Sequence, residues 1–153
     1  MNIILDEIKS KNLMSAKLWI EGGSGNDPEG KKGIHQLLSS TMLRGCGPFN
    51  NTQIAEIVES SGANLNCDTF EDGLLISLKC VENDAYKLLP LVGWMITNPI
   101  LQIDQIELEK YLTKKAIKRQ KESTYQLAFD DWRKMVYLDG PYGHDPLGSI
   151  DDI

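Results

Sequence analysis

The sequence has little cysteine, little histidine and no long apolar run. Of its 153 residues three are Cys and two are His. Cys46, Cys67 and Cys80 are an odd number without the spacing of a disulfide framework, so we expect free, buried thiols in a reducing compartment. No apolar stretch approaches the ~20 residues that a membrane-spanning helix needs. A disulfide scaffold is therefore excluded, and no membrane partner is expected.

Positive charge is also scarce. Lys and Arg number 16 against 22 Asp and Glu, which gives a net charge of −6. This is the wrong sign for a surface that neutralises phosphates, so no nucleic-acid partner is expected. The densest basic stretch, residues 114–121, has apolar residues between its charges and is typical of a solvated helix face.

The two ends of the sequence suggest expectations about location and extent. The start, MNIILDEIKSKNL, is too acidic and its apolar part too short for a signal peptide, so we expect a cytoplasmic protein. After Gly140 the sequence is rich in turn residues and ends at Ile153 without a terminating element. We therefore expect residues 1–153 to form a single domain that is cut short at its C-terminal end.

The first half of the sequence predicts two helices and a hairpin. Apolar residues recur at helical spacing over 34–42, and Gly45 ends that pattern. A second helix, capped by Asn50 or Asn51, should end at Gly62. The period then changes to two over 65–69 and 74–80, around the turn-like Glu71-Asp72-Gly73, which predicts an antiparallel hairpin.

The second half predicts three more helices. The third carries Ala85, Leu88, Leu89, Val92 and Ile96 on one face and ends at Asn98-Pro99, and the fourth runs from about Asp104 to Glu122. The fifth has an aromatic-rich stripe, which is typical of core packing; its members are Tyr125, Ala128, Phe129, Trp132, Met135 and Val136. Together these elements predict an α+β fold: a mixed, largely antiparallel sheet with helices packed on one face.

The loop before the first helix resembles a phosphate-binding loop. Residues Gly25 to Lys31 match that motif except at its last position, where Lys32 replaces the hydroxyl residue that contacts magnesium. Pro28 removes an amide donor, and Asp27 and Glu29 place negative charge where a polyanion would sit. A nucleotide-binding module is therefore a remote alternative.

The first helix also carries the residues HQLLS, from His35 to Ser39. This segment resembles the HxxEH motif of the insulinase and pitrilysin family of zinc metallopeptidases. In that family the two histidines bind zinc from one helix face and the glutamate polarises the attacking water. Here His35 matches the first histidine, Leu38 stands at the glutamate position and Ser39 at the second histidine.

The resemblance extends along nearly the whole sequence. Four further features are similar to the family pattern. They are a Gly-Ser loop with an acidic residue and a glycine before the helix, an Asn-small-x-Thr strand, a helix ending in Asn-Pro before a long charged helix, and a Pro-Tyr-Gly turn. The matching segments are LWIEGGSGNDPEGKKGIH, SGANLNCDTFED, MITNPILQIDQIELEKYLTKKAIKRQKES and AFDDWRKMVYLDGPYGHDPLGSIDDI. The resemblance implies a half-unit fold similar to that of insulinase and mitochondrial-processing-peptidase-like metallohydrolases.

The family's third zinc ligand is a glutamate on the long helix, and the matching residue is Ala116. Another family glutamate lies seven residues earlier and is matched by Glu109, which shares a helix face with position 116. The resemblance thus implies one retained ligand, His35, with Ser39 and Ala116 unable to replace the others. Glu109 alone cannot hold zinc, and Leu38 leaves no general base.

We therefore expect no catalytic residue, no bound zinc and no enzyme activity. The expected function is that of a noncatalytic homologue or subunit of an insulinase-like peptidase, contributing architecture to an assembly. A different class of function stays open: an active zinc endopeptidase with an unorthodox ligand set, for instance His35, His144 and a cysteine.

The expected partners are a homologous half-unit or a catalytic subunit, in a homo- or hetero-oligomer, and a peptide. The strand segment Asn66, Cys67, Asp68 and Thr69 resembles the family's active-site edge strand, which accepts an extended peptide as an added strand. Such an edge uses backbone groups and does not need the metal. The alternative is an edge strand that another part of the protein simply covers.

Overall fold

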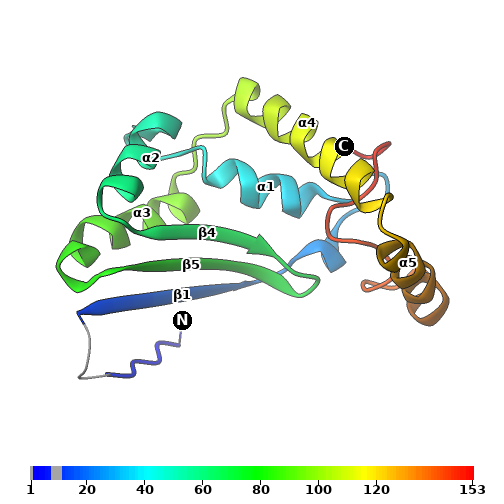
Figure 1. The fold of residues 1–153 in the computed structure, drawn as a ribbon, viewed down its shortest axis with the longest axis horizontal. Helices are drawn as coiled ribbons and strands as arrows, with labels where there is room; N and C mark the ends of the chain where they lie inside the picture. Colours follow the sequence, from blue (N-terminus) through cyan, green and yellow to red (C-terminus); the bar gives the residue numbers. More distant parts are fainter. Residues whose placement is uncertain (1, 8–11) are drawn as a thin grey trace.

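The structure is a computed structural model that describes residues 2–7 and 12–153 (Figure 1). The leading segment that was considered as a signal peptide, residues 1–13, lies partly outside the described residues. The elements follow in this order: β1 Leu13–Glu21, the 3-10 turn η1 Ser24–Asn26, α1 Ile34–Met42, β2 Gly45–Cys46, β3 Phe49–Asn50, α2 Asn51–Ser60, β4 Asn64–Thr69, β5 Gly73–Val81, the 3-10 turn η2 Glu82–Asp84, α3 Ala85–Thr97, α4 Ile103–Gln120 and α5 Thr124–Tyr137.

The main sheet has three strands in the order β1-β5-β4. The predicted hairpin is present: β4 pairs antiparallel with β5, and Thr69 lies opposite Leu74. Its turn is closed by the Phe70 amide, which donates to the Gly73 carbonyl at 2.8 Å. Strand β1 pairs antiparallel with the other side of β5. Both ladders within the described residues are antiparallel, and β4 lies at one edge of the sheet.

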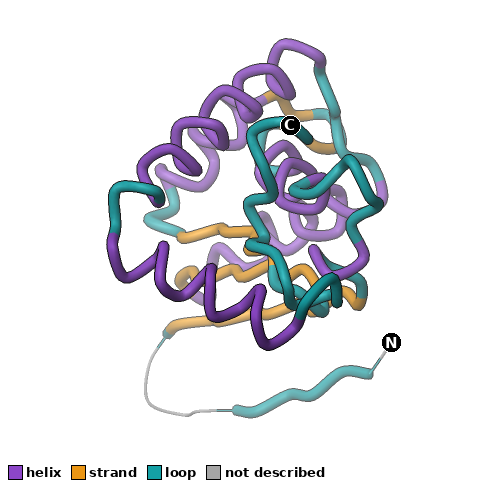
Figure 2. The backbone as a smooth tube through the Cα atoms, turned by 90° about the vertical axis from the view of Figure 1, so that its right-hand side faces the viewer, coloured by secondary structure: helices purple, strands orange, loops and turns teal. Residues whose placement is uncertain are grey.

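The helices cover one face of this sheet, and Figure 1 shows α1 and α4 stacked on that side. Alternate residues of β5 are buried beneath them, whereas Lys79 and Val81 between them are exposed. Figure 2 shows residues 2–7 on the opposite side of the strands from most of the helices. The buried core consists of Met42, Cys46, Ile54, Cys67, Ile76, Leu78, Cys80, Leu88, Leu91 and Met95. The α+β fold with helices packed on one face is confirmed.

Local signals for two helices are confirmed in detail. Asn50 caps α2, because its side chain accepts from the Gln53 amide at 3.0 Å while the Gln53 side chain accepts from the Asn50 amide at 3.0 Å. Helix α1 begins after Gly33 and ends at Met42, as its apolar spacing predicts. In the part of the chain that the structure describes, no helix is long and apolar enough to cross a membrane.

The predicted inner face of α3 is wrong in part, because Ala85, Leu88 and Val92 pack in the core as predicted but two other members do not. Leu88, Leu91 and Met95 are buried, whereas Leu89 and Ile96 are 45% and 40% exposed. Helix α3 is apolar around most of its circumference, so two stripes satisfy the same helical spacing. The periodicity identified a helix but could not select which stripe faces the sheet.

The predicted core role of the α5 stripe is also wrong. No residue of α5 is buried, and Trp132, Met135 and Val136 are 48%, 80% and 52% exposed. Its aromatic rings contact one another instead, as in the stacked pair Phe129 and Trp132 with centroids 5.4 Å apart. The spacing correctly gave one apolar face, but nothing in the described residues covers that face.

Candidate functional site

The candidate site begins in the loop before α1, at Asp27. Its carboxylate is fully buried; Oδ2 accepts from the Gly33 amide at 2.6 Å and Oδ1 from the His35 amide at 3.3 Å. These are amide groups that the first turn of a helix leaves without partners, and the helix dipole favours a negative charge there. Asp27 therefore stabilises the start of α1.

The same contacts bear on the nucleotide-binding alternative. A phosphate-binding loop uses free amides at a helix N-terminus to hold phosphate. Here Asp27 takes those amides, and its buried charge would repel a phosphate at the same place. The Gly25 to Lys31 loop thus has its anion position filled by the protein itself.

Asp27 also holds the retained histidine. His35 Nδ1 lies 2.5 Å from Asp27 Oδ1, and the His35 side chain is 24% exposed. Because a carboxylate only accepts hydrogen bonds, Nδ1 carries the proton and Nε2 is directed away from the loop. Metal-binding histidines commonly have such a carboxylate behind them, which fixes their orientation.

Ser39, at the second histidine position, is buried one helical turn later. Its Oγ donates to the Gln36 carbonyl at 2.9 Å and accepts from Thr69 Oγ1 at 2.8 Å. Thr69 belongs to β4, so this hydroxyl pair joins α1 to the edge strand of the sheet. Leu38, at the glutamate position, is partly buried and packs against the core.

On α4 the buried residues are Glu109, Thr113 and Ile117, whereas Ala116 is only half-buried. Glu109 forms an ion pair with Arg44, whose Nε lies 2.6 Å from Glu109 Oε1. A carboxylate paired in this way is neutralised within the protein. Glu109 therefore links α4 to the segment after α1.

The residues at the three ligand positions do not fit a zinc ion. Catalytic zinc takes three protein ligands, and of His35, Ser39 and Ala116 only the imidazole is a ligand of the usual kind. Within residues 2–7 and 12–153, no three His, Cys, Asp or Glu side chains are grouped so that they could hold a metal ion. The unorthodox set of His35, His144 and a cysteine is accordingly not assembled there, and the three cysteines are free and buried.

The second histidine of the sequence, His144, also lies near Asp27, with its Nε2 4.0 Å from Asp27 Oδ2, but its hydrogen bonds go elsewhere. His144 Nε2 lies 2.9 Å from the Ser24 carbonyl, and Lys32 Nζ lies 3.3 Å from Nδ1. Burial, followed by the Lys32 charge, lowers the pKa of His144 from its ordinary value of 6.5. The ring is thus neutral at pH 7, with Nε2 as donor and Nδ1 as acceptor.

The strand proposed to bind peptide, β4, lies at the sheet edge, since it pairs only with β5 among the described strands. Its side chains alternate: Cys67 is buried and Thr69 partly buried beneath the helices, whereas Asn66 and Asp68 are exposed on the other face. The backbone of its free edge can accept an added strand. Peptide binding itself stays a prediction.

Two features of the site were missed by reasoning from the sequence: the Asp27 link to His35 and the Arg44 link to Glu109. An acidic residue in the loop before the helix was noted, and its spacing from His35 could have suggested a carboxylate partner for the ring. Arg44 carried no such signal, because 65 positions separate it from Glu109.

Comparison with known proteins gives a family match, distant relatives and similar solved structures. The model of one protein family, described as Insulinase (Peptidase family M16), matches residues 2–147. The chain is 22% identical over 136 residues to the mitochondrial-processing peptidase subunit beta of Neurospora crassa, covering 89% of this chain and 29% of that protein. It is 24% identical over 150 residues to the mouse cytochrome b-c1 complex subunit 1, covering 98% and 31%.

Two solved structures have the same fold. One is described as the peptidase M16 inactive domain from Pseudomonas fluorescens, with a TM-score of 0.84 and 21% identity over 92% of this chain and 34% of that chain. The other is a protease from Helicobacter pylori, with a TM-score of 0.85, 22% identity and coverage of 92% and 34%. The chain therefore spans about a third of the length of the proteins it matches.

Proposed function

We propose that this chain, which belongs to the insulinase family, peptidase family M16, is a noncatalytic member of an assembly of homologous half-units. In this role it contributes architecture, and the free edge of β4 contributes a surface for an extended peptide. The observation that carries the proposal is the state of Ser39. At the position of a zinc ligand, it is buried and joins α1 to β4 through Thr69.

Several contacts support the absence of catalysis. The family's general base position is occupied by Leu38, an apolar side chain that packs against the core. Ala116 offers no donor, and the nearby carboxylate of Glu109 is already paired with Arg44. Without a metal or a base, no group at this site can activate a water molecule.

The assembly role is supported by the relatives and by the exposed surface. Two matched relatives are named as subunits of larger proteins, and one matched structure is described as an inactive domain of an M16 peptidase. The chain exposes the apolar side of α5 and a sheet edge, both of which are features that a partner commonly covers.

The test of catalysis is elemental analysis of the purified chain combined with cleavage of an unstructured fluorogenic peptide. We expect less than stoichiometric zinc and no chelator-sensitive cleavage, before or after incubation with zinc. An intact HxxEH homologue, prepared in the same way, is the positive control. One zinc per chain together with cleavage that a chelator abolishes would overturn the proposal.

The same measurement decides the alternative, an active zinc endopeptidase with an unorthodox ligand set. One observation favours this alternative: Asp27 orients His35 as a metal ligand is oriented. If the alternative holds, His35→Gln should remove both the metal and the cleavage. This variant is to be measured once the wild-type chain has shown both bound zinc and cleavage.

The test of assembly is light scattering together with binding to an intact HxxEH half-unit. We expect self-association or a complex with that half-unit. A chain that stays monomeric at high concentration and binds no half-unit would count against the assembly role, whatever the zinc result.

We also propose a cytoplasmic location, since the three cysteines are free thiols as a reducing compartment would keep them.

A further inference from the structure

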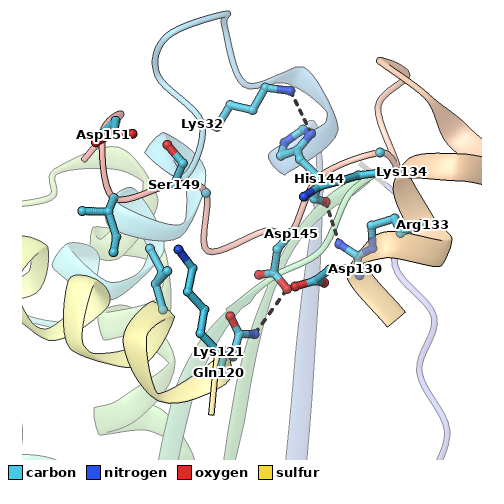
Figure 3. Close-up of a pocket in the computed structure, with 14 residues that line it drawn as sticks. Lys32, Gln120, Lys121, Asp130, Arg133, Lys134, His144, Asp145, Ser149 and Asp151 are labelled. Carbon is cyan, nitrogen blue, oxygen red and sulfur yellow. Dashed lines mark hydrogen bonds between the residues drawn. The ribbon is translucent and has the colours of Figure 1, made fainter. Parts of the chain in front are cut away.

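A cavity of about 270 Å³ lies between the end of α4, helix α5 and the segment 143–151 (Figure 3). It lies outside the set of residues that match the zinc motif. Its lining includes four cationic and three acidic side chains, although the whole chain has a net charge of −6. The charges that matter most are those of Lys32, Lys121, Lys134, Arg133, Asp130 and Asp145.

The three lysines have no charged partner. In the part of the chain that the structure describes, no carboxylate lies within 4.0 Å of Lys32, Lys121 or Lys134. Figure 3 shows Lys121 and Lys134 reaching toward the cavity from different helices. Ammonium groups that line one cavity repel one another, and an anion bound there reduces that repulsion.

Two of the three carboxylates that line the cavity are already engaged in hydrogen bonds, and the third, that of Asp151, is exposed. Asp145 accepts from the Gln120 and Gln126 side chains at 3.2 and 3.3 Å and from the Leu147 amide at 2.8 Å. Asp130 accepts from Gln126 at 3.0 Å. These hydrogen bonds hold the two acids along one side of the cavity and spread their charge over amide donors.

His144 positions Lys32 at the cavity. Its neutral ring accepts from Lys32 Nζ through Nδ1 at 3.3 Å, while Nε2 donates to the Ser24 carbonyl at 2.9 Å. The imidazole therefore holds the ammonium group in place without neutralising it. An anion bound beside Lys32 would in turn favour the charged form of His144.

The chemistry of the donors selects the kind of anion. The planar fork of Arg133 would favour a carboxylate, but it is occupied by the His144 carbonyl at 2.6 Å and lies 3.8 Å from Glu71. The remaining donors are lysines, which act as point charges and suit a tetrahedral group. We propose that this cavity binds the phosphate group of a small molecule, held by Lys32, Lys121 and Lys134.

The proposal does not depend on the proposed function and can be tested on the whole chain. The probes are inorganic phosphate and glycerol phosphate, compared with succinate and with chloride at equal ionic strength. Because the sequence has two histidines, the imidazole NMR signals can be assigned with a single His35→Gln variant. Both phosphate probes should give saturable binding by calorimetry and raise the pH midpoint of His144.

The test variant is Lys121→Gln with Lys134→Gln, two exposed lysines whose replacement should leave the fold intact. We expect at least a tenfold weaker affinity for phosphate and no remaining effect on the His144 midpoint. The matched control, Lys79→Gln with Lys118→Gln, changes the net charge equally at exposed positions outside the cavity and should bind as the parent does. Equal binding of succinate, an equal loss in the control, or a response that chloride reproduces would overturn the proposal.

Discussion

Restoring the zinc motif tests the residue-by-residue alignment directly. The variant combines Leu38→Glu, Ser39→His and Ala116→Glu. His35 and residue 39 are one helical turn apart on one face of α1, and the new glutamate on α4 would supply the third ligand. Asp27 already holds His35 Nδ1, so the ring is oriented for a metal on Nε2.

The position of Ala116 follows from the ion pair between Arg44 and Glu109. Helices α1 and α4 pack against each other and run in opposite directions (Figure 1). From the end of α1 at Met42, just before Arg44, five residues back reach Leu37, a step of ~8 Å at about 1.5 Å per residue. Seven residues on from Glu109 along α4 reach Ala116, a step of ~10 Å. Ala116 should therefore lie level with the middle of the motif on α1.

The cost without metal can be estimated from the surroundings of Ser39, which is 0% exposed. Overpacking this site with an imidazole should cost ~1–3 kcal/mol, and the lost hydrogen bond from Thr69 about 1 kcal/mol. At roughly 2–4 °C per kcal/mol for a chain of this size, the stripped variant should melt ~5–15 °C below the parent. Zinc at a hundredfold excess over its Kd should return about 2.7 kcal/mol.

Thermal unfolding with zinc and with a chelator measures both effects, and calorimetry measures the affinity. Ser39→His alone should bind zinc weakly, because two ligands are too few. Adding Asp27→Asn to the triple variant should weaken zinc binding by roughly 10- to 100-fold, because it removes the carboxylate that orients the ligating His35 ring. If the triple variant folds yet zinc neither binds nor stabilises it more than the parent, the assignment of position 116 is wrong.

Further predictions concern the contacts around the site. Asp27→Ala should lower the free energy of unfolding in urea by ~2–4 kcal/mol, because it removes a helix cap and a charge-assisted hydrogen bond; a loss below about 0.5 kcal/mol would contradict this. Arg44→Met should destabilise by roughly 3–5 kcal/mol by leaving Glu109 buried and unpaired, and adding Glu109→Leu should recover most of the loss; failure of the second change to help would refute the pairing argument. Burial, with a further contribution from the charge of a neighbouring aspartate, raises the pKa of Cys67 to about 11, so a thiol reagent at pH 8 should modify it after unfolding and not before. The pKa of His144 is lowered in the folded chain, so the unfolded chain binds the imidazole proton at a higher pH. The free energy of unfolding should therefore fall as the pH drops below 6.5. His144→Gln should reduce that fall, which urea titrations at several pH values measure.

Local patterns in the sequence predicted the local structure well. The change from helical spacing to period two placed the hairpin of β4 and β5, and Asn50 marked the start of α2. These signals act over neighbouring residues, where backbone hydrogen bonding and side-chain alternation decide the conformation. The elements therefore followed from residues a few positions apart.

What covers an apolar face could not be predicted in the same way. The α5 stripe was expected in the core, but Trp132 and Met135 are 48% and 80% exposed. Hydrophobic spacing shows that a helix has an apolar side and does not show which surface lies against it. The same limit applied to α3, where Leu89 lies on a stripe that is equally regular and half exposed.

The residues at the family ligand positions on α1 are held by hydrogen bonds to other parts of the chain. His35 is tied to the loop through Asp27, and Ser39 is tied to β4 through Thr69. Each link joins α1 to a different part of the chain, and each involves a residue at a family ligand position. Removing the hydroxyl pair costs about 1 kcal/mol. The free energy of zinc binding must therefore exceed the stability lost with the Ser39–Thr69 hydrogen bond, whereas the Asp27–His35 link is kept and favours binding. For this reason the stability of the stripped variant is as informative as its affinity for zinc.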